Sequence, residues 1–588
     1  MGIKIKDGVV RFLVVSLVLG LGACSAQAFQ PFIPSTTMQI AKEVESRTAK
    51  PKISSELVRV GISTTGFSNY DYNEIKIYGT DDIEIYNDGR LIASFPQHDA
   101  VKITYANGIY MIYDVDDKVV DNVMGDIKII SENGLLGVVG LKRVSKAALY
   151  RGEFELVAKD ANKFNLVNIV ELEEYLRGVV PNEMPIRFGL EALKAQSVAA
   201  RNYVLSPRVK SSPNYDVVDS VASQVYFGAN TETKISDDAV LETTGVVALY
   251  GWDLILAQYS STAGGYSESF SNAFSDPKTK EFPSEGKPYL IAKPDMLSQR
   301  PLNKEEDAAE FYKSKPDSYD IRSPYFRWTK EWSAEELRAN LEETLVKQSA
   351  TGFVTPEFKK GDVLGEILSI EAKKRGESGK IVELEIITKD KTYKVFKELV
   401  IRRLFVKDGK ALPSANVVFE QQVDENGALT TITAYGGGYG HGVGMSQFGA
   451  GFMGEELKFK YDKILQHYYT GITLATKPII ISGVDGQQEV SQQFYSNGKY
   501  GQLIVDNKFQ VNKLIAVINE KEHEFELCKG MLAQNRICRI DIEKYLKKGI
   551  NNITFKFPLE EGDKKALRLF VEVVKSEDLN EKWSSETN

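Results

Sequence analysis

The glutamate at position 183 lies in the stretch VVPNEMP, between Pro181 and Pro185 and among apolar neighbours. Prolines restrict the backbone, and apolar surroundings disfavour an ionised carboxylate, so we expect the pKa of Glu183 to be raised. A carboxyl group with a pKa near neutrality can donate a proton to a leaving group and later accept one. The alternative is a helix-capping acid, stabilised by the positive end of the helix dipole.

A second candidate stretch is SSTAGGYSES, residues 260–269. The hydroxyls of Ser261 and Thr262, with the backbone of Gly264 and Gly265, predict either a site for sugar hydroxyls or a simple turn. A serine nucleophile would need a Gly-x-Ser-x-Gly elbow or a recognisable base partner, and neither is evident. A metal hydrolase would need clustered histidines. The chain has four scattered ones: His98, His441, His467 and His523.

Residues 434–451, AYGGGYGHGVGMSQFGAG, place glycine at every second position from Gly436 to Gly444. No lysine follows as a phosphate-binding P-loop requires, and the spacing does not fit a dinucleotide fingerprint. In an extended chain these glycines would form one bare face, with Tyr439 and His441 projecting from the other. A bare face allows close approach of another chain. The alternative is a tightly packed strand with a buried histidine.

Helices and strands must position these residues. The stretch FGLEALKAQSVAARNYVL predicts a helix over 188–205, in which small residues allow close packing. A strand and a short helix precede it, and a proline-bounded turn is expected at Glu183. The stretch 333–348 predicts an amphipathic helix. Short alternating runs predict β-rich regions before residue 164, over 363–425 and over 478–575.

Length and composition place the chain among globular proteins. Its 588 residues predict about two to four domains. The residues are 43% hydrophobic and 26% charged, which is ordinary for an α+β fold and argues against disorder. The net charge of −8 argues against nucleic acid as a partner, because such surfaces are usually basic.

The N-terminus predicts export. Lys4, Lys6 and Arg11 precede the apolar run FLVVSLVLGLGA, which is short for a membrane span and typical of a signal-peptide core. Cleavage after Ala28 and lipidation of Cys24, which ends LGAC in the manner of a lipoprotein box, remain open alternatives. An uncleaved membrane anchor is the third.

Two further cysteines, Cys528 and Cys538, lie ten residues apart near the C-terminus. An oxidising compartment would allow a disulfide between them, and two buried free thiols are the alternative. No cysteine lies between residues 25 and 527, so a cysteine-rich zinc site is excluded from the middle of the chain.

Six stretches, taken in order, resemble the stage II sporulation protein D and amidase-enhancer family. They span roughly residues 165–472, extend weakly upstream to VRVGIS, and leave the C-terminal tail uncovered. They are VVPNEMP with the helix that follows it, SQVYFG, SSTAGGYSES, SPYFRWT, LPSANVVF and GGGYGHGVGMSQFGAGFMG.

The resemblance implies work on the cell wall. Sporulation members look like lytic transglycosylases that cut peptidoglycan strands lacking stem peptides, and enhancer members are described as stimulating an amidase. The family's catalytic glutamate corresponds to Glu183. The resemblance makes Arg201, Tyr203, His441 and Gln447 candidate cleft residues without individual roles. The further candidates for substrate contact are Ser261, Thr262, Gly264, Gly265 and Tyr439.

The chain departs from the family at one place. Some members bind zinc near the S-T-x-G-G segment through cysteine and histidine ligands. Here Ser260 stands where the family often has histidine, Tyr266 replaces a common basic residue, and no cysteine is near. We therefore expect no metal and no other cofactor.

The sequence is compatible with two functions. The first is an exported lytic transglycosylase of the cell envelope, which acts on peptidoglycan glycan strands and is attached to the membrane by a lipid or anchor. The second is a non-catalytic glycan-binding protein that activates a cell-wall amidase. The expected divisions are a signal segment (1–28), a tether (29–55), a β-rich region (56–164), a catalytic core (165–475, with an insertion at 330–430) and a C-terminal β module (478–575).

Overall fold

The computed structural model describes residues 56–206, 211–295, 300–425, 427–484, 487–557 and 565–575. The predicted signal segment with Cys24 and the predicted tether lie outside the described residues. Helices account for 20% and strands for 38% of the structure, in several sheets, which confirms the α+β fold class. Among the described residues, no helix is both long and apolar enough to cross a bilayer.

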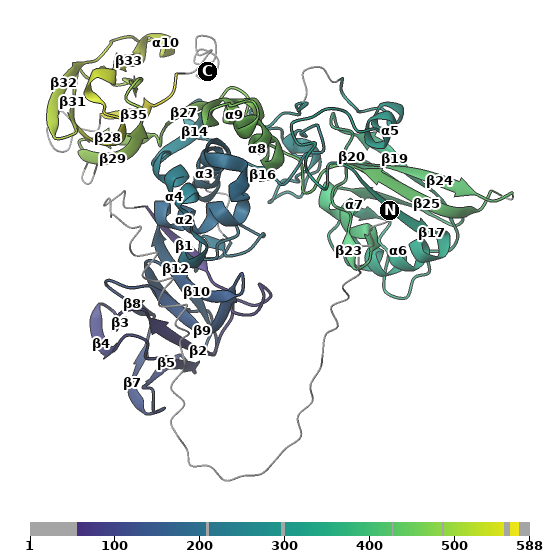
Figure 1. The fold of residues 1–588 in the computed structure, drawn as a ribbon, viewed down its shortest axis with the longest axis horizontal. Coiled ribbons are helices and arrows are strands. Elements are labelled where there is room, and N and C mark those ends of the chain that lie inside the picture. Colours follow the sequence, from purple (N-terminus) through teal and green to yellow (C-terminus); the bar gives the residue numbers. More distant parts are fainter. Residues whose placement is uncertain are drawn as a thin grey trace, which may run out of the picture.

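Two sheets form the N-terminal β region (Figure 1). Alternation builds them: in β5, Val101, Ile103 and Tyr105 are buried, whereas Lys102 and Thr104 are not. The first sheet runs β13-β1-β12-β11-β8-β3-β4 and the second β10-β9-β2-β5-β6-β7. Their strands are β1 (Leu57–Gly61), β2 (Glu74–Gly79), β3 (Ile83–Asn87), β4 (Arg90–Phe95), β5 (Val101–Ala106), β6 (Ile109–Tyr113), β7 (Val119–Met124), β8 (Ile127–Ile130), β9 (Leu136–Arg143), β10 (Lys146–Tyr150), β11 (Glu153–Ala158), β12 (Phe164–Glu171) and β13 (Val217–Val218).

A group of helices follows, packed around α3 (Gly189–Leu205). The prediction of a helix over 188–205 is confirmed, and its alanines Ala192, Ala195 and Ala199 are buried against neighbouring helices. Small side chains let the helix axes approach closely. The other helices of the group are α2 (Leu172–Glu183), α4 (Lys234–Leu241), α8 (Gln447–Glu455) and α9 (Tyr461–Tyr468).

The C-terminal strands form two sheets, and one of them continues into the helical core. The strand β27 (Thr473–Thr476) pairs with β14 (Val246–Tyr250) on one side and with β35 (Ala566–Glu572) on the other. That sheet runs β15-β14-β27-β35-β30-β33, and the second runs β29-β34-β31-β32. The remaining strands are β15 (Asp253–Leu254), β28 (Ile479–Ser482), β29 (Glu489–Ser496), β30 (Gln502–Asp506), β31 (Lys513–Ile518), β32 (Lys521–Glu526), β33 (Ile537–Asp541) and β34 (Gly549–Lys556). A disulfide joins Cys528 and Cys538.

The segment between α4 and α8 contains a further lobe, whose hydrophobic cluster runs from Trp332 to Ala434. The prediction of a helix over 333–348 is confirmed by α6 (Ala334–Ser349), which begins at a capping box of Ser333 and Glu336. The helix α5 (Glu305–Lys313) was missed, because its surroundings are loop-rich. The other main elements are β17 (Trp328–Ser333), β19 (Ile367–Arg375), β20 (Ile381–Thr388), β21 (Thr392–Phe396), α7 (Glu398–Leu404), β24 (Val417–Val423) and β25 (Leu429–Gly436).

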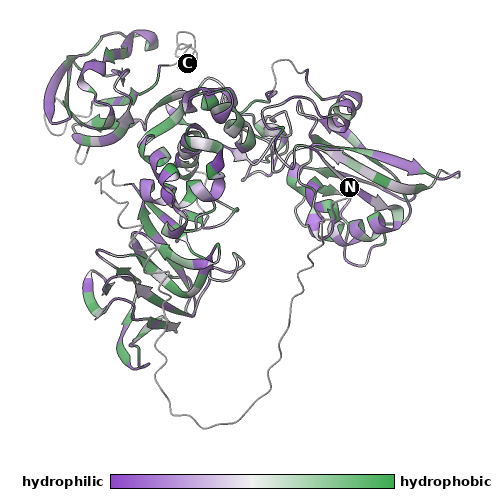
Figure 2. Ribbon diagram, viewed as in Figure 1, coloured by the Kyte–Doolittle hydropathy of each residue, from purple (hydrophilic) through white to green (hydrophobic). Residues whose placement is uncertain are grey.

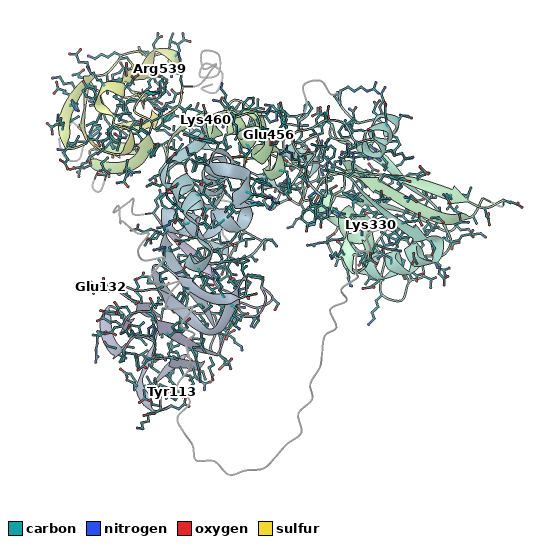
Figure 3. The ribbon with its side chains drawn as sticks, in the orientation of Figure 1. Tyr113, Glu132, Lys330, Glu456, Lys460 and Arg539 are labelled. Carbon is teal, nitrogen blue, oxygen red and sulfur yellow. A yellow bond between two sulfur atoms is a disulfide. The ribbon has the colours of Figure 1, made fainter. Side chains whose placement is uncertain are left out.

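The N-terminal sheets, the C-terminal sheets and the lobe that contains α6 lie around the group of helices (Figure 1). Figure 3 labels Lys330 on the lobe that contains α6 and Arg539 on the C-terminal sheets. Glu456, beyond the end of α8, forms an ion pair at 2.6 Å with Arg322, which lies in the loop before β17. The strands mix hydrophobic and hydrophilic residues along their length, as sheets with one buried face require (Figure 2).

Candidate functional site

Glu183 is the last residue of α2, and Pro181 lies within the final turn of that helix. The expected proline-bounded turn is therefore helical as far as the glutamate itself. The capping alternative is wrong, because Glu183 occupies the C-terminal end of a helix. There the dipole is negative and disfavours a charged carboxylate.

The Glu183 carboxyl group is enclosed by protein, while solvent still reaches part of the side chain. Its Oε1 accepts a hydrogen bond from the backbone N–H of Val225 at 2.6 Å. Burial raises the pKa of Glu183 to about 7, and the Val225 N–H lowers it only in part. A burial effect of this kind keeps the acid protonated near neutrality, which suits proton donation.

Three tyrosines and a glutamine enclose this acid. Tyr175 comes from α2, Tyr203 from α3 and Tyr259 from β16 (Tyr259–Ser260). Burial, followed by the negative charge of Glu183, raises the pKa of Tyr203 to about 12 and that of Tyr259 well above its usual value. The phenols therefore remain protonated at physiological pH and can only donate or accept hydrogen bonds.

Gln224 connects two of these phenols. Tyr175 donates to Gln224 Oε1 at 3.1 Å, and Gln224 Nε2 donates to the Tyr259 hydroxyl at 3.0 Å. The structure thus brings the predicted residue Tyr203 together with Glu183. Three residues were missed: Tyr175, Gln224 and Tyr259. Gln224 belongs to the SQVYFG motif and Tyr259 directly precedes SSTAGGYSES, so the motifs themselves carried the signal.

Arg201 has no exposed surface. Its guanidinium donates to both carboxylate oxygens of Glu173, at 2.8 and 2.5 Å, and to the carbonyl of Val246 at 2.9 Å. These contacts leave no surface for a glycan. The expectation of a substrate-binding role is replaced by a structural one, a buried ion pair that joins α2 to α3.

The S-T-x-G-G segment forms a turn held from inside the protein. The carboxylate of Asp320 accepts hydrogen bonds from the Thr262 hydroxyl and from the N–H groups of Gly264 and Gly265. Thr262 is fully buried, and both glycines have positive φ angles of +77° and +99°. The turn interpretation therefore accounts for these three residues. Ser261 alone keeps partial exposure.

The expectation of a regular extended strand through the glycine segment is wrong. Strand β25 ends at Gly436, and Gly438, Gly440, Gly442 and Gly444 all have φ angles between +68° and +105°. These are left-handed conformations that glycine tolerates and other residues rarely adopt. The bare surface is also covered by the chain itself: a Cβ on Gly444 would lie 2.0 Å from the carbonyl oxygen of Gln258.

His441 is held as a neutral residue. Its Nδ1 accepts a hydrogen bond from the backbone N–H of Val443 at 3.0 Å, and its ring lies 5.1 Å from the ring of Phe274. Burial, with the nearby cations Lys380 and Arg402, lowers the pKa of His441 to about 3. The ring also makes a hydrogen bond with the backbone of Tyr259, which links the glycine segment to the tyrosines around Glu183.

The last two predicted cleft residues differ in exposure. Tyr439 is 44% exposed and packs on Tyr325, with ring centroids 4.4 Å apart. Gln447, the first residue of α8, is buried and donates to Gln196 Oε1 at 3.2 Å. Tyr439 is thus available to a ligand, whereas Gln447 serves mainly the contact between α8 and α3.

The residues near Ser260 do not supply the cysteine and histidine ligands that hold zinc in some family members. The segment offers hydroxyl groups, and the two cysteines of the described chain are joined in the C-terminal sheets. Across the described ranges, no group of three or more His, Cys, Asp and Glu side chains is arranged to hold a metal ion. No chemical step is therefore assigned to a metal at this site.

Comparison with known proteins matches two family models. Residues 160–250 match the model described as Stage II sporulation protein (SpoIID). This stretch includes Glu183 and Gln224, and it contains α3 with its neighbours α2, α4 and β14. Residues 277–444 match a model described as a domain of unknown function (DUF8618), wider than the predicted insertion at 330–430.

Curated relatives match about half of the chain. It is 31% identical over 311 residues to a protein named Amidase enhancer from Bacillus subtilis, and covers 40% of that protein's length. It is 29% identical over 325 residues to Stage II sporulation protein D of the same species, with 76% of that protein covered. An uncharacterized protein of Brachyspira hyodysenteriae is 28% identical over 314 residues, with 68% covered. Residues 160–250 therefore match the SpoIID family model, and about half of the chain is similar to proteins named Stage II sporulation protein D and Amidase enhancer.

Proposed function

We propose that this protein is an exported peptidoglycan lytic transglycosylase, with Glu183 as its single acid and base. The observation that carries the proposal is the placement of Glu183: a carboxyl group enclosed by protein, on a partly accessible side chain, with a pKa raised to about 7 by burial. Catalytic acids are placed in such environments because they must hold a proton at the pH of the reaction.

The proposed reaction needs one carboxyl group and consumes no water. Protonated Glu183 donates its proton to the glycosidic oxygen between N-acetylmuramic acid and N-acetylglucosamine, and the C1–O bond breaks. The resulting carboxylate accepts the proton of the muramyl 6-hydroxyl, whose oxygen bonds to C1 and closes a 1,6-anhydro ring. Ordinary glycoside hydrolysis usually uses a second carboxylate, to activate water or to attack the sugar.

The phenols around Glu183 support this assignment. Tyr203 and Tyr259 stay protonated, so they lie beside the acid as neutral groups, and the raised pKa of Glu183 is due to burial. The N–H of Val225 stabilises the carboxylate that forms after the first proton transfer. Together these groups allow the glutamate to cycle between its two protonation states.

The proposed setting is the cell envelope. The signal segment predicts export, and the names of the relatives, Stage II sporulation protein D and Amidase enhancer, point to sporulation and the cell wall. The proposed substrate is a glycan strand that lacks stem peptides. Lipidation at Cys24, and attachment to the membrane through it, belongs to this proposal.

One observation favours a second function. The chain is 31% identical to a protein named Amidase enhancer, and the expected glycan contacts of Arg201, Thr262 and Gln447 are replaced by internal contacts. A protein that binds glycan and activates a cell-wall amidase without cutting would need no acid. The raised pKa of Glu183 favours the enzyme.

Incubation of the purified protein with glycan strands lacking stem peptides tests the proposal. Mass spectrometry is expected to detect anhydromuramyl ends, and Glu183→Gln is expected to abolish them while keeping the fold. If neither protein cuts but both bind the strands equally, the enzyme assignment is wrong. An increase in the activity of an added amidase would then identify the second function.

A further inference from the structure

Two phenylalanines from distant parts of the sequence lie side by side near Glu183. Phe67 belongs to the loop between β1 and β2, and Phe227 belongs to the SQVYFG motif of the core. Their ring centroids are 6.1 Å apart and their planes differ by only 15°. Neither residue has a role in the proposed reaction.

Both residues are partly exposed to solvent. Phe67 is 37% exposed. In the segment 224–227, Gln224 and Tyr226 are buried, whereas Val225 and Phe227 are partly exposed. This alternation is that of an extended chain, so Val225 and Phe227 point to the same, outer side.

A buried cation supports the pair from behind. The guanidinium carbon of Arg143 lies 4.6 Å from the ring centroid of Phe67 and 5.9 Å from that of Phe227. Arg143 is itself only 5% exposed and donates to the Asp219 carboxylate and to the Ser63 carbonyl, both at 2.6 Å. Because the arginine occupies the inner side, the exposed area of the rings faces outward.

The loop holds Phe67 in an unfavourable backbone conformation. Its φ angle is +66°, in the left-handed region that bulky residues rarely occupy. Its N–H donates to the Ser63 hydroxyl at 3.1 Å, and the Ser63 N–H donates to Asp219 at 3.2 Å. The contacts with Phe227 and Arg143 offset part of this strain, but they leave the ring partly exposed. A large apolar side chain held in a strained and partly exposed position points to a binding role.

The pair is close to the proposed catalytic acid. Val225 donates its N–H to Glu183, and Phe227 lies two residues further on, about 7 Å along an extended chain. The N–H of Phe227 also donates to the carbonyl of Gly178 in α2, the helix that ends at Glu183. The pair is therefore within reach of a glycan strand bound at Glu183.

We propose that Phe67 and Phe227 form a stacking platform for a sugar ring of the glycan strand, next to the bond that Glu183 cleaves. The inference rests on the proposed function and adds a subsite to it. Aromatic faces carry partial negative charge and attract the C–H groups of a pyranose face, while they bury apolar surface. The exposed polar residues beside Phe67 suit the hydroxyl groups at the rim of a sugar: Thr65, Ser68 and Asn69.

Phe67→Gly is the most informative variant, because glycine accepts the positive φ angle. We expect it to keep the melting temperature of the parent and to lose affinity, whereas a merely structural phenylalanine would lose stability. Binding of glycan strands lacking stem peptides is measured by calorimetry in the Glu183→Gln background, so that nothing is cut. Phe67→Gly and Phe227→Ala are each expected to weaken binding about fivefold to tenfold.

Phe509→Ala is the matched control. Phe509 is 43% exposed, similar to Phe67, and lies between β30 and β31 in the C-terminal sheets. It is expected to leave the affinity unchanged. Phe67→Trp, which retains an aromatic face, is expected to keep at least half of the parent affinity.

The outcomes separate this inference from the proposed reaction. If Phe67→Gly and Phe227→Ala bind strands as tightly as the parent, the platform is wrong, even where the Glu183 enzyme cuts. If they bind weakly but the enzyme with Glu183 never produces anhydromuramyl ends, the platform stands and the reaction fails. Unchanged glycan affinity with lost stimulation of an amidase would mark the pair as a protein contact and overturn the inference.

Discussion

At the scale of single residues, Glu183 is an acid whose ionisation the fold opposes. Burial raises its pKa to about 7, against 4.5 for an unperturbed glutamate. Two predictions follow from this difference, one for activity and one for stability.

The activity of the proposed enzyme should fall at alkaline pH. Glu183 must be protonated to donate, so kcat/KM is expected to fall about tenfold per pH unit above pH 7. The measurement is the release of anhydromuramyl products across pH 5 to 9. Strand binding by Glu183→Gln serves as the control and should stay flat over the same range. A fall in kcat/KM that begins well below pH 6 would contradict the assignment of Glu183 as the acid.

Glu183→Gln should stabilise the protein above neutrality. Between pH 4.5 and 7 the folded state binds the proton and the unfolded state loses it, so stability falls as the pH rises. Above pH 7 the ionised carboxylate destabilises the folded protein by on the order of 3 kcal/mol. Glutamine avoids this loss, so unfolding in urea should show a more stable variant at pH 8 and equal stabilities below pH 4.

Arg201 offers a prediction that separates structure from substrate binding. Arg201→Ala leaves the carboxylate of Glu173 buried without its partner, which is expected to lower the free energy of unfolding by about 3 to 5 kcal/mol. The double variant Arg201→Met with Glu173→Leu removes both charges and should recover most of that loss. Urea unfolding measures both. A raised KM with unchanged stability would restore the substrate-binding role.

At the scale of elements, the glycine segment after β25 is defined by backbone conformation rather than by an open face. Gly444 has a φ angle of +72° and its Cα faces the carbonyl of Gln258. Gly442 has a similar φ angle of +68°, but the nearest atom to an added Cβ is the Lys380 ammonium at 3.9 Å. The two positions therefore separate backbone strain from steric contact.

We expect Gly442→Ala to lower the free energy of unfolding by about 1 to 2 kcal/mol, the cost of a left-handed alanine. Gly444→Ala carries the same strain and adds a collision with backbone, so it should lose several kcal/mol more or fail to fold. Denaturant unfolding of the two variants side by side makes the comparison. Equal losses would mean that the collision with Gln258 is relieved by a backbone shift.

At the scale of the whole molecule, the C-terminal strands and the helical core share a sheet. Val247 and Leu249 of β14 pack with Ile504 and Phe570 from the C-terminal strands. The ring of Phe570 also contacts that of Trp252 at 4.9 Å. Of the two sheets built from the C-terminal strands, one therefore extends into the core.

Two buried phenylalanines test this continuity. Phe570 lies in the shared sheet and Phe555 in the second sheet, and both are fully buried. Truncation to alanine should destabilise either site by about 3 to 5 kcal/mol. Hydrogen exchange is expected to rise in β14 and β27 for Phe570→Ala, and to rise only in the C-terminal strands for Phe555→Ala. Identical exchange patterns would mean that the two regions unfold independently.

Much of this protein was determined by local sequence. The pattern of small, apolar and polar side chains predicted α3 and α6 because hydrogen bonds within a helix involve neighbours in the chain. Glu183 was singled out as a candidate from its prolines and apolar neighbours, and the predicted export to an oxidising compartment allowed the pairing of Cys528 with Cys538. The ordered motifs identified the relatives.

Only the tertiary structure decided which residues meet. Tyr175, Gln224 and Tyr259 come together near Glu183 from three separate segments, and Phe67 reaches Phe227 from the loop between β1 and β2. Arg201 is a buried ion pair rather than a ligand for sugar, and the alternating glycines are left-handed rather than extended. The reason is physical: burial, pKa and backbone strain depend on contacts between residues far apart in the chain, and sequence spacing alone does not encode those distances.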